Sequence, residues 1–134
     1  MTYSPATHAL SVNPATGETL AACPWATAEA VEQAIALADT GFRQWRSESV
    51  AHRAQKLRDL GAALRERAEE MAQMMSREMG KPILQARAEV TKSASLCDWY
   101  AEHGPAMLTA EATQVEQNNA VIEYRPLGPI LAVM

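Results

Sequence analysis

The sequence predicts an α/β fold in which helices come before the main strands. Apolar residues recur at steps of three and four between about residues 27 and 103, which is the spacing of a helix face. After residue 112 the pattern changes to alternation, as in a half-buried strand. The run 130–134 is continuously apolar, which is typical of a strand covered on both faces. The length of 134 residues suits one ordinary domain.

The first predicted element is a short β-hairpin. Leu10 and Val12 predict one strand, and residues 19–21 predict the returning strand. The connecting sequence at 13–18 opens with Asn-Pro, and Gly17 can supply a positive φ. We expect the hairpin to end near residue 25.

Two helices are predicted next. Thr27 is a good N-cap for the first, which runs to about Arg46 and carries its apolar stripe at Val31, Ile35, Ala38, Phe42 and Trp45. Ser47 or Ser49 can cap the second, whose stripe consists of Val50, Ala54, Leu57, Leu60 and Leu64.

A third helix, or a bent continuation of the second, carries four methionines. Gly80 is placed to stop it, and Pro82 to start the next helix. The fourth helix is predicted from about Ile83 to His103, where Gly104-Pro105 ends it. Its apolar positions are mostly alanine, so we expect close packing against a neighbour.

Two strands are predicted after the helices. They cover 113–117 and 120–125, around an Asn118-Asn119 turn, because asparagine tolerates the left-handed backbone of a type I′ turn. Residues 126–129 break the pattern before the apolar run 130–134. A strand buried on both faces usually opens a βαβ unit. We therefore expect this sequence to be a truncated, front part of a larger protein.

Composition narrows the class of protein. Apolar residues make up 48% and charged residues 21%, which argues against disorder. The formal net charge of −4 gives no basic surface for nucleic acid. Charges interrupt every apolar stretch, so we expect no membrane association through a spanning helix. The two cysteines show no disulfide framework, and we expect a cytoplasmic location.

No catalytic or metal-binding motif emerges from the residues alone. Gly80-Lys81 fails the phosphate-loop pattern, because Met75 occupies the first glycine position and Pro82 the Ser/Thr position. Cys23 and Cys97 are expected to be buried, inert thiols. The histidines lack ligand spacing, so no metal site is predicted; they are His8, His52 and His103.

Four strings in order resemble the N-terminal part of the NAD(P)-dependent aldehyde dehydrogenase superfamily. They are NPATGE at 13–18, FRQWR at 42–46, EMGKP at 78–82 and YRPLGPILAVM at 124–134. Their order and spacing make the resemblance specific, and it covers nearly the whole chain. The stretch CDWYAEHGP at 97–105 is most similar to bacterial succinate-semialdehyde dehydrogenases.

The resemblance implies a layout in three parts. Residues 1–112 would supply N-terminal strands and helices of the cofactor-binding domain, and 113–125 the hairpin of the oligomerisation domain. Residues 126–134 would start the central parallel sheet. The nucleophilic Cys, general-base Glu and nucleotide loop of the family have no counterpart here, so no catalytic or cofactor-binding residue is assigned. The chain would be about the first quarter to third of such an enzyme.

The resemblance also implies a function for the whole enzyme. It would oxidise an aldehyde, most simply succinate semialdehyde, to its acid with NAD or NADP, as a homo-oligomer joined through the 113–125 hairpin. The isolated chain is predicted to be inactive and to bind neither cofactor tightly. The fourth helix lines the substrate entrance in related enzymes, and Lys92 falls where a cation would attract the carboxylate of a semialdehyde acid.

Two plainer interpretations stand beside these. Lys92 would otherwise be a solvated lysine on a helix surface. The chain would otherwise be a non-enzymatic helical interaction module, with a groove made by Met71, Met74, Met75 and Met79. The apolar run 130–134 favours the enzyme, because a finished module would not end inside a buried strand.

Overall fold

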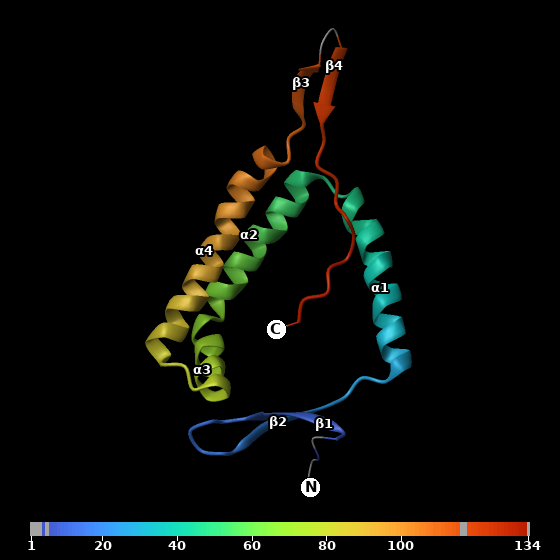
Figure 1. Cartoon of the computed structure of the whole chain (residues 1–134). Helices are drawn as coiled ribbons and strands as arrows, with labels where there is room; N and C mark the ends of the chain where they lie inside the picture. Colours follow the sequence, from blue (N-terminus) through green and yellow to red (C-terminus); the bar gives the residue numbers. More distant parts are fainter. Residues whose placement is uncertain (1–3, 5, 116–117, 134) are drawn as a thin grey trace.

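A computed structural model of the chain describes residue 4 and residues 6–115 and 118–133. Helices and two small sheets make up these residues, which agrees with the predicted α/β class (Figure 1). The elements in chain order are β1 (His8–Val12), β2 (Thr19–Pro24), α1 (Ala28–Ser47), α2 (Val50–Glu66), α3 (Ala68–Met79), α4 (Ile83–Met107), β3 (Glu111–Val115) and β4 (Asn118–Ile122).

Strands β1 and β2 form the predicted antiparallel hairpin. The Asn13 side chain accepts the Ala15 N–H at 2.9 Å, and Gly17 has a φ of 75°, as the turn chemistry requires. The turn lies against the end of α3, where a Cβ on Gly80 would come within 3.1 Å of Pro14. Two of the four family-like strings, 13–18 and 78–82, therefore meet in space.

The core lies where α2 and α3 pack along α4, and it is built from small side chains. Its buried residues are Ala54, Ala72, Ala86, Val90, Ala94 and Ala101. Gly61 on α2 is also buried, and a Cβ there would lie 3.1 Å from the Ala94 carbonyl oxygen. Small residues thus let the two helices approach closely, as the alanines of the fourth predicted helix indicated.

Three of the predicted helix boundaries are confirmed. Thr27 accepts the Ala30 N–H at 3.1 Å at the start of α1, and Ser49 accepts the His52 N–H at 3.1 Å at the start of α2. Gly80 ends α3 in the left-handed conformation, with a φ of 67°. The methionine-rich segment is a separate helix, because the backbone breaks at Arg67.

Helix α1 forms as predicted but its apolar stripe is not covered. None of its residues is buried, and Ile35 in the middle of the stripe is 59% exposed. Figure 1 shows α1 standing apart from the α2–α4 pair and joined to it only at one end. Its apolar face is therefore open to another partner.

Helix α4 runs further than predicted. Gly104-Pro105 was expected to end it, but the helix continues through Pro105 to Met107. Proline has no N–H to donate to the carbonyl of Ala101, four residues back. The guanidinium of Arg58 on α2 donates to that carbonyl at 3.3 Å instead. A side chain from the neighbouring helix thus replaces the missing bond and lets the helix pass the proline.

The second hairpin forms, but its strands pair in a different register from the predicted one. Asn118 and Asn119 lie inside β4, opposite Val115 and Gln114, so the predicted Asn-Asn turn is wrong. The part of the predicted strand at 116–117 lies outside the described residues. The observed register lets the Tyr124 hydroxyl donate to the Glu111 carboxylate at 3.1 Å.

The expected strand at 130–134 is not formed in this chain. Residues 130–133 belong to no sheet, and Met134 lies outside the described residues. Ile130 is 88% exposed, although its apolar character suits a buried strand. A strand needs a neighbouring backbone to complete its hydrogen bonds, and no described strand lies in position to supply one.

No helix among the described residues is both long enough and apolar enough to cross a membrane.

Candidate functional site

Lys92 lies on an exposed face of α4, beside a shallow depression of about 450 Å³. The lining residues all come from this one helix: Ala88, Glu89, Lys92, Ser93 and Leu96. Lys92 forms no ion pair with any residue that the structure describes. The depression therefore presents an uncompensated ammonium group beside apolar and hydroxyl side chains, which suits a small anion with a short carbon chain.

Glu89, on the rim of the same depression, is already paired. Its carboxylate binds the ammonium of Lys81, eight residues earlier, in the segment between α3 and α4. The Lys81 side chain is 28% exposed, and that of Glu89 is 49% exposed. Partial burial makes this pair stronger than a fully exposed one, because fewer water molecules screen it.

A second ion pair fixes α3 against α4. The Arg87 guanidinium donates two hydrogen bonds of 2.8 Å to the Glu69 carboxylate, and Gln73 adds a third at 3.0 Å. These bonds favour the charged carboxylate and lower the pKa of Glu69 from 4.5 to about 2, with Arg87 as the main cause. The network holds the face that carries Lys92 in a fixed orientation relative to α3.

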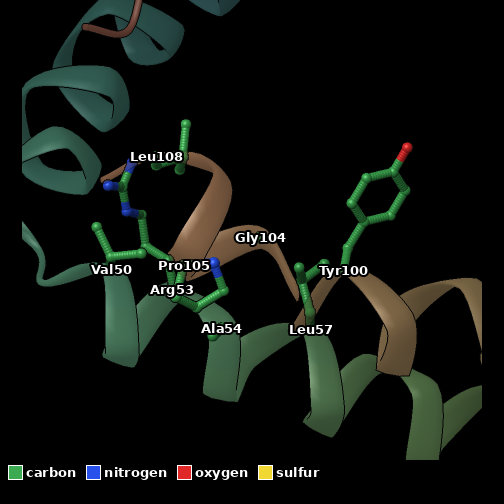
Figure 2. Close-up of a pocket in the computed structure, with 8 residues that line it drawn as sticks. All are labelled: Val50, Arg53, Ala54, Leu57, Tyr100, Gly104, Pro105 and Leu108. Atoms are coloured by element: carbon green, nitrogen blue, oxygen red, sulfur yellow. The ribbon is translucent and has the colours of Figure 1, made fainter. Parts of the chain in front are cut away.

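A separate apolar hollow of about 280 Å³ lies between the start of α2 and the end of α4 (Figure 2). Its lining residues are Val50, Arg53, Ala54, Leu57, Tyr100, Gly104, Pro105 and Leu108. The Nε of Arg53 is buried there and has no hydrogen-bond partner within the described part of the chain. The lining contains neither a carboxylate nor a thiol, so the hollow suits packing better than acid–base or covalent chemistry.

The remaining sequence candidates do not converge on one site. Cys23 is exposed at the end of β2, which corrects the expectation of a buried thiol, because it faces the open side of a two-stranded sheet. Cys97 is half-buried on α4. In the described residues, no three His, Cys, Asp or Glu side chains are grouped so that they could hold a metal ion.

The methionines of α3 are divided between packing and exposure. Met71 and Met75 are half-buried, whereas Met74 and Met79 are exposed. Gly80 and Lys81 form the stop of α3 and the turn into α4.

Sequence reasoning missed three features: an ion pair, a hydrogen bond between helices and a close helix contact. The spacing Lys81 to Glu89 crosses from a loop into a helix, so helix periodicity does not reveal the pair. Arg58 looks like an ordinary surface residue until Pro105 is seen to leave the Ala101 carbonyl unpaired. Gly61 gave no signal beyond its small size beside the apolar stripe of its helix.

Residues 3–134 match the aldehyde dehydrogenase family, and the chain belongs to that family. The chain is 69% identical over all its 134 residues to the Escherichia coli K12 succinate semialdehyde dehydrogenase [NAD(P)+] Sad. It is 41% identical over 127 residues, 92% of its length, to succinate-semialdehyde dehydrogenase [NADP(+)] 1 of Mycobacterium bovis BCG.

The fold agrees with this membership. A crystal structure of succinate-semialdehyde dehydrogenase from Burkholderia pseudomallei superimposes with a TM-score of 0.74 and 27% identity, over 82% of this chain and 23% of that one. The chain spans 29% of the length of the E. coli relative and 28% of the M. bovis one. It thus corresponds to about a quarter of such an enzyme.

Proposed function

We propose that the chain is the N-terminal portion of an enzyme that oxidises succinate semialdehyde to succinate with NAD or NADP. The observation that carries the proposal is the 69% identity to the E. coli succinate semialdehyde dehydrogenase along the entire chain. The names of the E. coli and M. bovis relatives both include NADP, so the assays of this proposal use NADP as well as NAD. The methionine-groove alternative lacks a comparable observation.

Within this proposal the chain supplies scaffold rather than reacting groups. Residues 1–112 belong to the cofactor-binding domain, 113–125 to the oligomerisation domain and 126–134 to the start of the central sheet. The exposed run at 130–133 and the uncovered stripe of α1 are the surfaces that the rest of the enzyme covers. The hairpin β3–β4 joins subunits into a homo-oligomer, and the enzyme acts in the cytoplasm.

Lys92 is the substrate-facing residue of this proposal. Its ammonium attracts the carboxylate of succinate semialdehyde toward the entrance, and the adjacent depression accepts the short carbon chain. The contribution is electrostatic attraction at an exposed site, so it weakens as salt is added.

The test is a chimaera in which these 134 residues replace the corresponding 29% of the E. coli relative. We expect it to reduce NAD or NADP with succinate semialdehyde, and Lys92→Met in it to raise KM for this substrate more than for butanal. A folded chimaera without turnover contradicts the proposed function. Equal KM changes for succinate semialdehyde and butanal would contradict the substrate-facing role of Lys92.

The isolated chain provides the complementary measurement. We expect no NAD or NADP reduction above a buffer control with succinate semialdehyde, and no tight binding of either cofactor by calorimetry. Turnover by the 134-residue chain would contradict the assignment of the reacting groups to other parts of the enzyme.

A further inference from the structure

We propose that Lys81 controls the charge of the Lys92 depression by occupying Glu89. In this arrangement Glu89 is kept from pairing with Lys92, and the Lys92 ammonium stays available to an incoming carboxylate. The inference rests on the proposed function only in taking succinate semialdehyde as the anion. Lys81 and Glu89 are positioning residues here, and neither pairs with the carboxylate of the substrate.

Helix spacing alone favours a different pair. Glu89 and Lys92 are three residues apart on α4, with the acid on the N-terminal side, a spacing at which side chains are neighbours. The chain forms ion pairs at this spacing elsewhere: Lys56 with Asp59 at 3.7 Å, and Arg67 with Glu70 at 2.7 Å. The lack of a Glu89–Lys92 pair in the described residues therefore needs a cause.

The cause is the fixed position of Lys81. It lies between Gly80, held in the left-handed conformation, and Pro82, whose φ is −53°. Pro82 restricts the backbone of Lys81, the residue before it, to extended conformations, so less backbone freedom is lost when the Lys81 side chain reaches forward to Glu89 on α4. Lys92 is exposed on α4, and an exposed pair with a carboxylate that Lys81 already neutralises gains little over the side-chain entropy it costs.

The neighbouring cation is also committed. Arg87, two residues before Glu89, is held by two hydrogen bonds to Glu69 on α3. The depression thus contains one carboxylate neutralised by Lys81 and one ammonium without a partner in the described residues. Its local charge is positive although the whole chain carries −4, and this arrangement attracts a substrate that carries a carboxylate.

The chain offers a clean measurement, because it contains only three lysines, Lys56, Lys81 and Lys92. We would follow their ¹³Cε signals by NMR in the 134-residue chain during a titration with succinate at constant ionic strength. The neutral diamide of succinate serves as the parallel control. Lys56, already paired with Asp59, is the internal reference.

The variants separate the charge effect from loss of structure. We expect succinate to move the Lys92 signal more than that of Lys56, and Lys81→Met to reduce this response about two- to fivefold, because Glu89 then pairs with Lys92. Lys81→Met/Glu89→Gln should restore the wild-type response, which a merely structural defect would not do. Glu89→Gln alone should leave the response unchanged or larger.

Three results would overturn the inference. They are a Lys92 response no larger than that of Lys56, an unchanged response in Lys81→Met, and a reduced response in Glu89→Gln. If circular dichroism shows that Lys81→Met loses helix, the NMR response of Glu89→Gln is used instead, and a reduced response in that variant overturns the inference.

The chimaera then distinguishes this inference from the proposed function. There, Lys81→Met should raise KM for succinate semialdehyde about two- to fivefold without raising it for butanal, and the double variant should restore it. If the NMR pattern appears while KM stays unchanged, the charge control holds and the substrate-entrance role of Lys92 fails.

Discussion

Gly61→Ala tests whether close approach of α2 and α4 holds the core together. A Cβ at position 61 would lie 3.1 Å from the Ala94 carbonyl oxygen, 3.1 Å from Oδ1 of Asp98 and 3.3 Å from the Cβ of Cys97. The Asp98 carboxylate can rotate away, but the other two atoms move only if α4 itself moves. Overpacking of this kind costs about 1–3 kcal/mol.

Helix propensity acts in the opposite direction. Replacing glycine by alanine inside a helix stabilises it by about 1 kcal/mol. Since two of the three close contacts are rigid, we expect the upper half of the overpacking range and a net loss of about 1–2 kcal/mol. Urea unfolding of the 134-residue chain, followed by circular dichroism at 222 nm, measures this difference.

Gly41→Ala is the matched control for that measurement. Gly41 is also inside a helix, but a Cβ there meets no atom within 4 Å. Only the gain in helix propensity remains, so this variant should be at least as stable to urea as the wild type. If Gly61→Ala is as stable as Gly41→Ala, the α2–α4 contact is not as close as described, and the reasoning fails.

Two further predictions concern the polar contacts. Arg58→Met should cost about 0.5–1.5 kcal/mol in the urea assay by leaving the Ala101 carbonyl unpaired, and adding Pro105→Ala should recover most of it by restoring an N–H donor; a double variant no more stable than Arg58→Met would refute this. The pKa of Glu69 is lowered to about 2 by Arg87 and Gln73, so its network stabilises the fold above pH 4.5, and this contribution is lost as the pH falls toward 2. Glu69→Gln should flatten the pH dependence of the urea midpoint in that window, and an unchanged dependence would show that the network adds nothing.

Local chemistry made much of the fold predictable. Thr27, Ser49 and Gly80 begin or end helices through their own side chains or backbone freedom, and each does so where the sequence indicated. The first hairpin likewise follows from the Asn-Pro and Gly chemistry of 13–18. Such features depend on neighbours in the sequence and need no knowledge of the rest of the fold.

The errors come from contacts between distant residues. Pro105 was expected to end α4, because no residue near it in the sequence replaces its missing N–H. The replacement donor is Arg58, which lies 43 positions before Ala101, the residue whose carbonyl it binds. The hairpin turn was placed at Asn118-Asn119 by turn propensity, whereas the pairing places both residues in β4. A shift of the strand register by an even number of residues keeps each side chain on the same face of the sheet. The alternation of apolar and polar residues therefore does not reveal such a shift.

The candidate site was predictable in part. The helix that carries Lys92 and its exposure follow from periodicity, but the pairing of Lys81 with Glu89 does not. That pairing depends on how the turn at Gly80 and Pro82 directs the chain, which is a property of three-dimensional structure.

The most direct test of the central claim is the substrate preference of the chimaera that carries these 134 residues. Its kcat/KM for succinate semialdehyde, divided by that for butanal, is compared with the same ratio for the E. coli relative. A chain that is the N-terminal portion of a succinate-semialdehyde-oxidising enzyme should keep this ratio within about threefold, a difference of under 1 kcal/mol in relative transition-state binding. A soluble, folded chimaera that turns over butanal but has lost its preference for succinate semialdehyde would contradict the account.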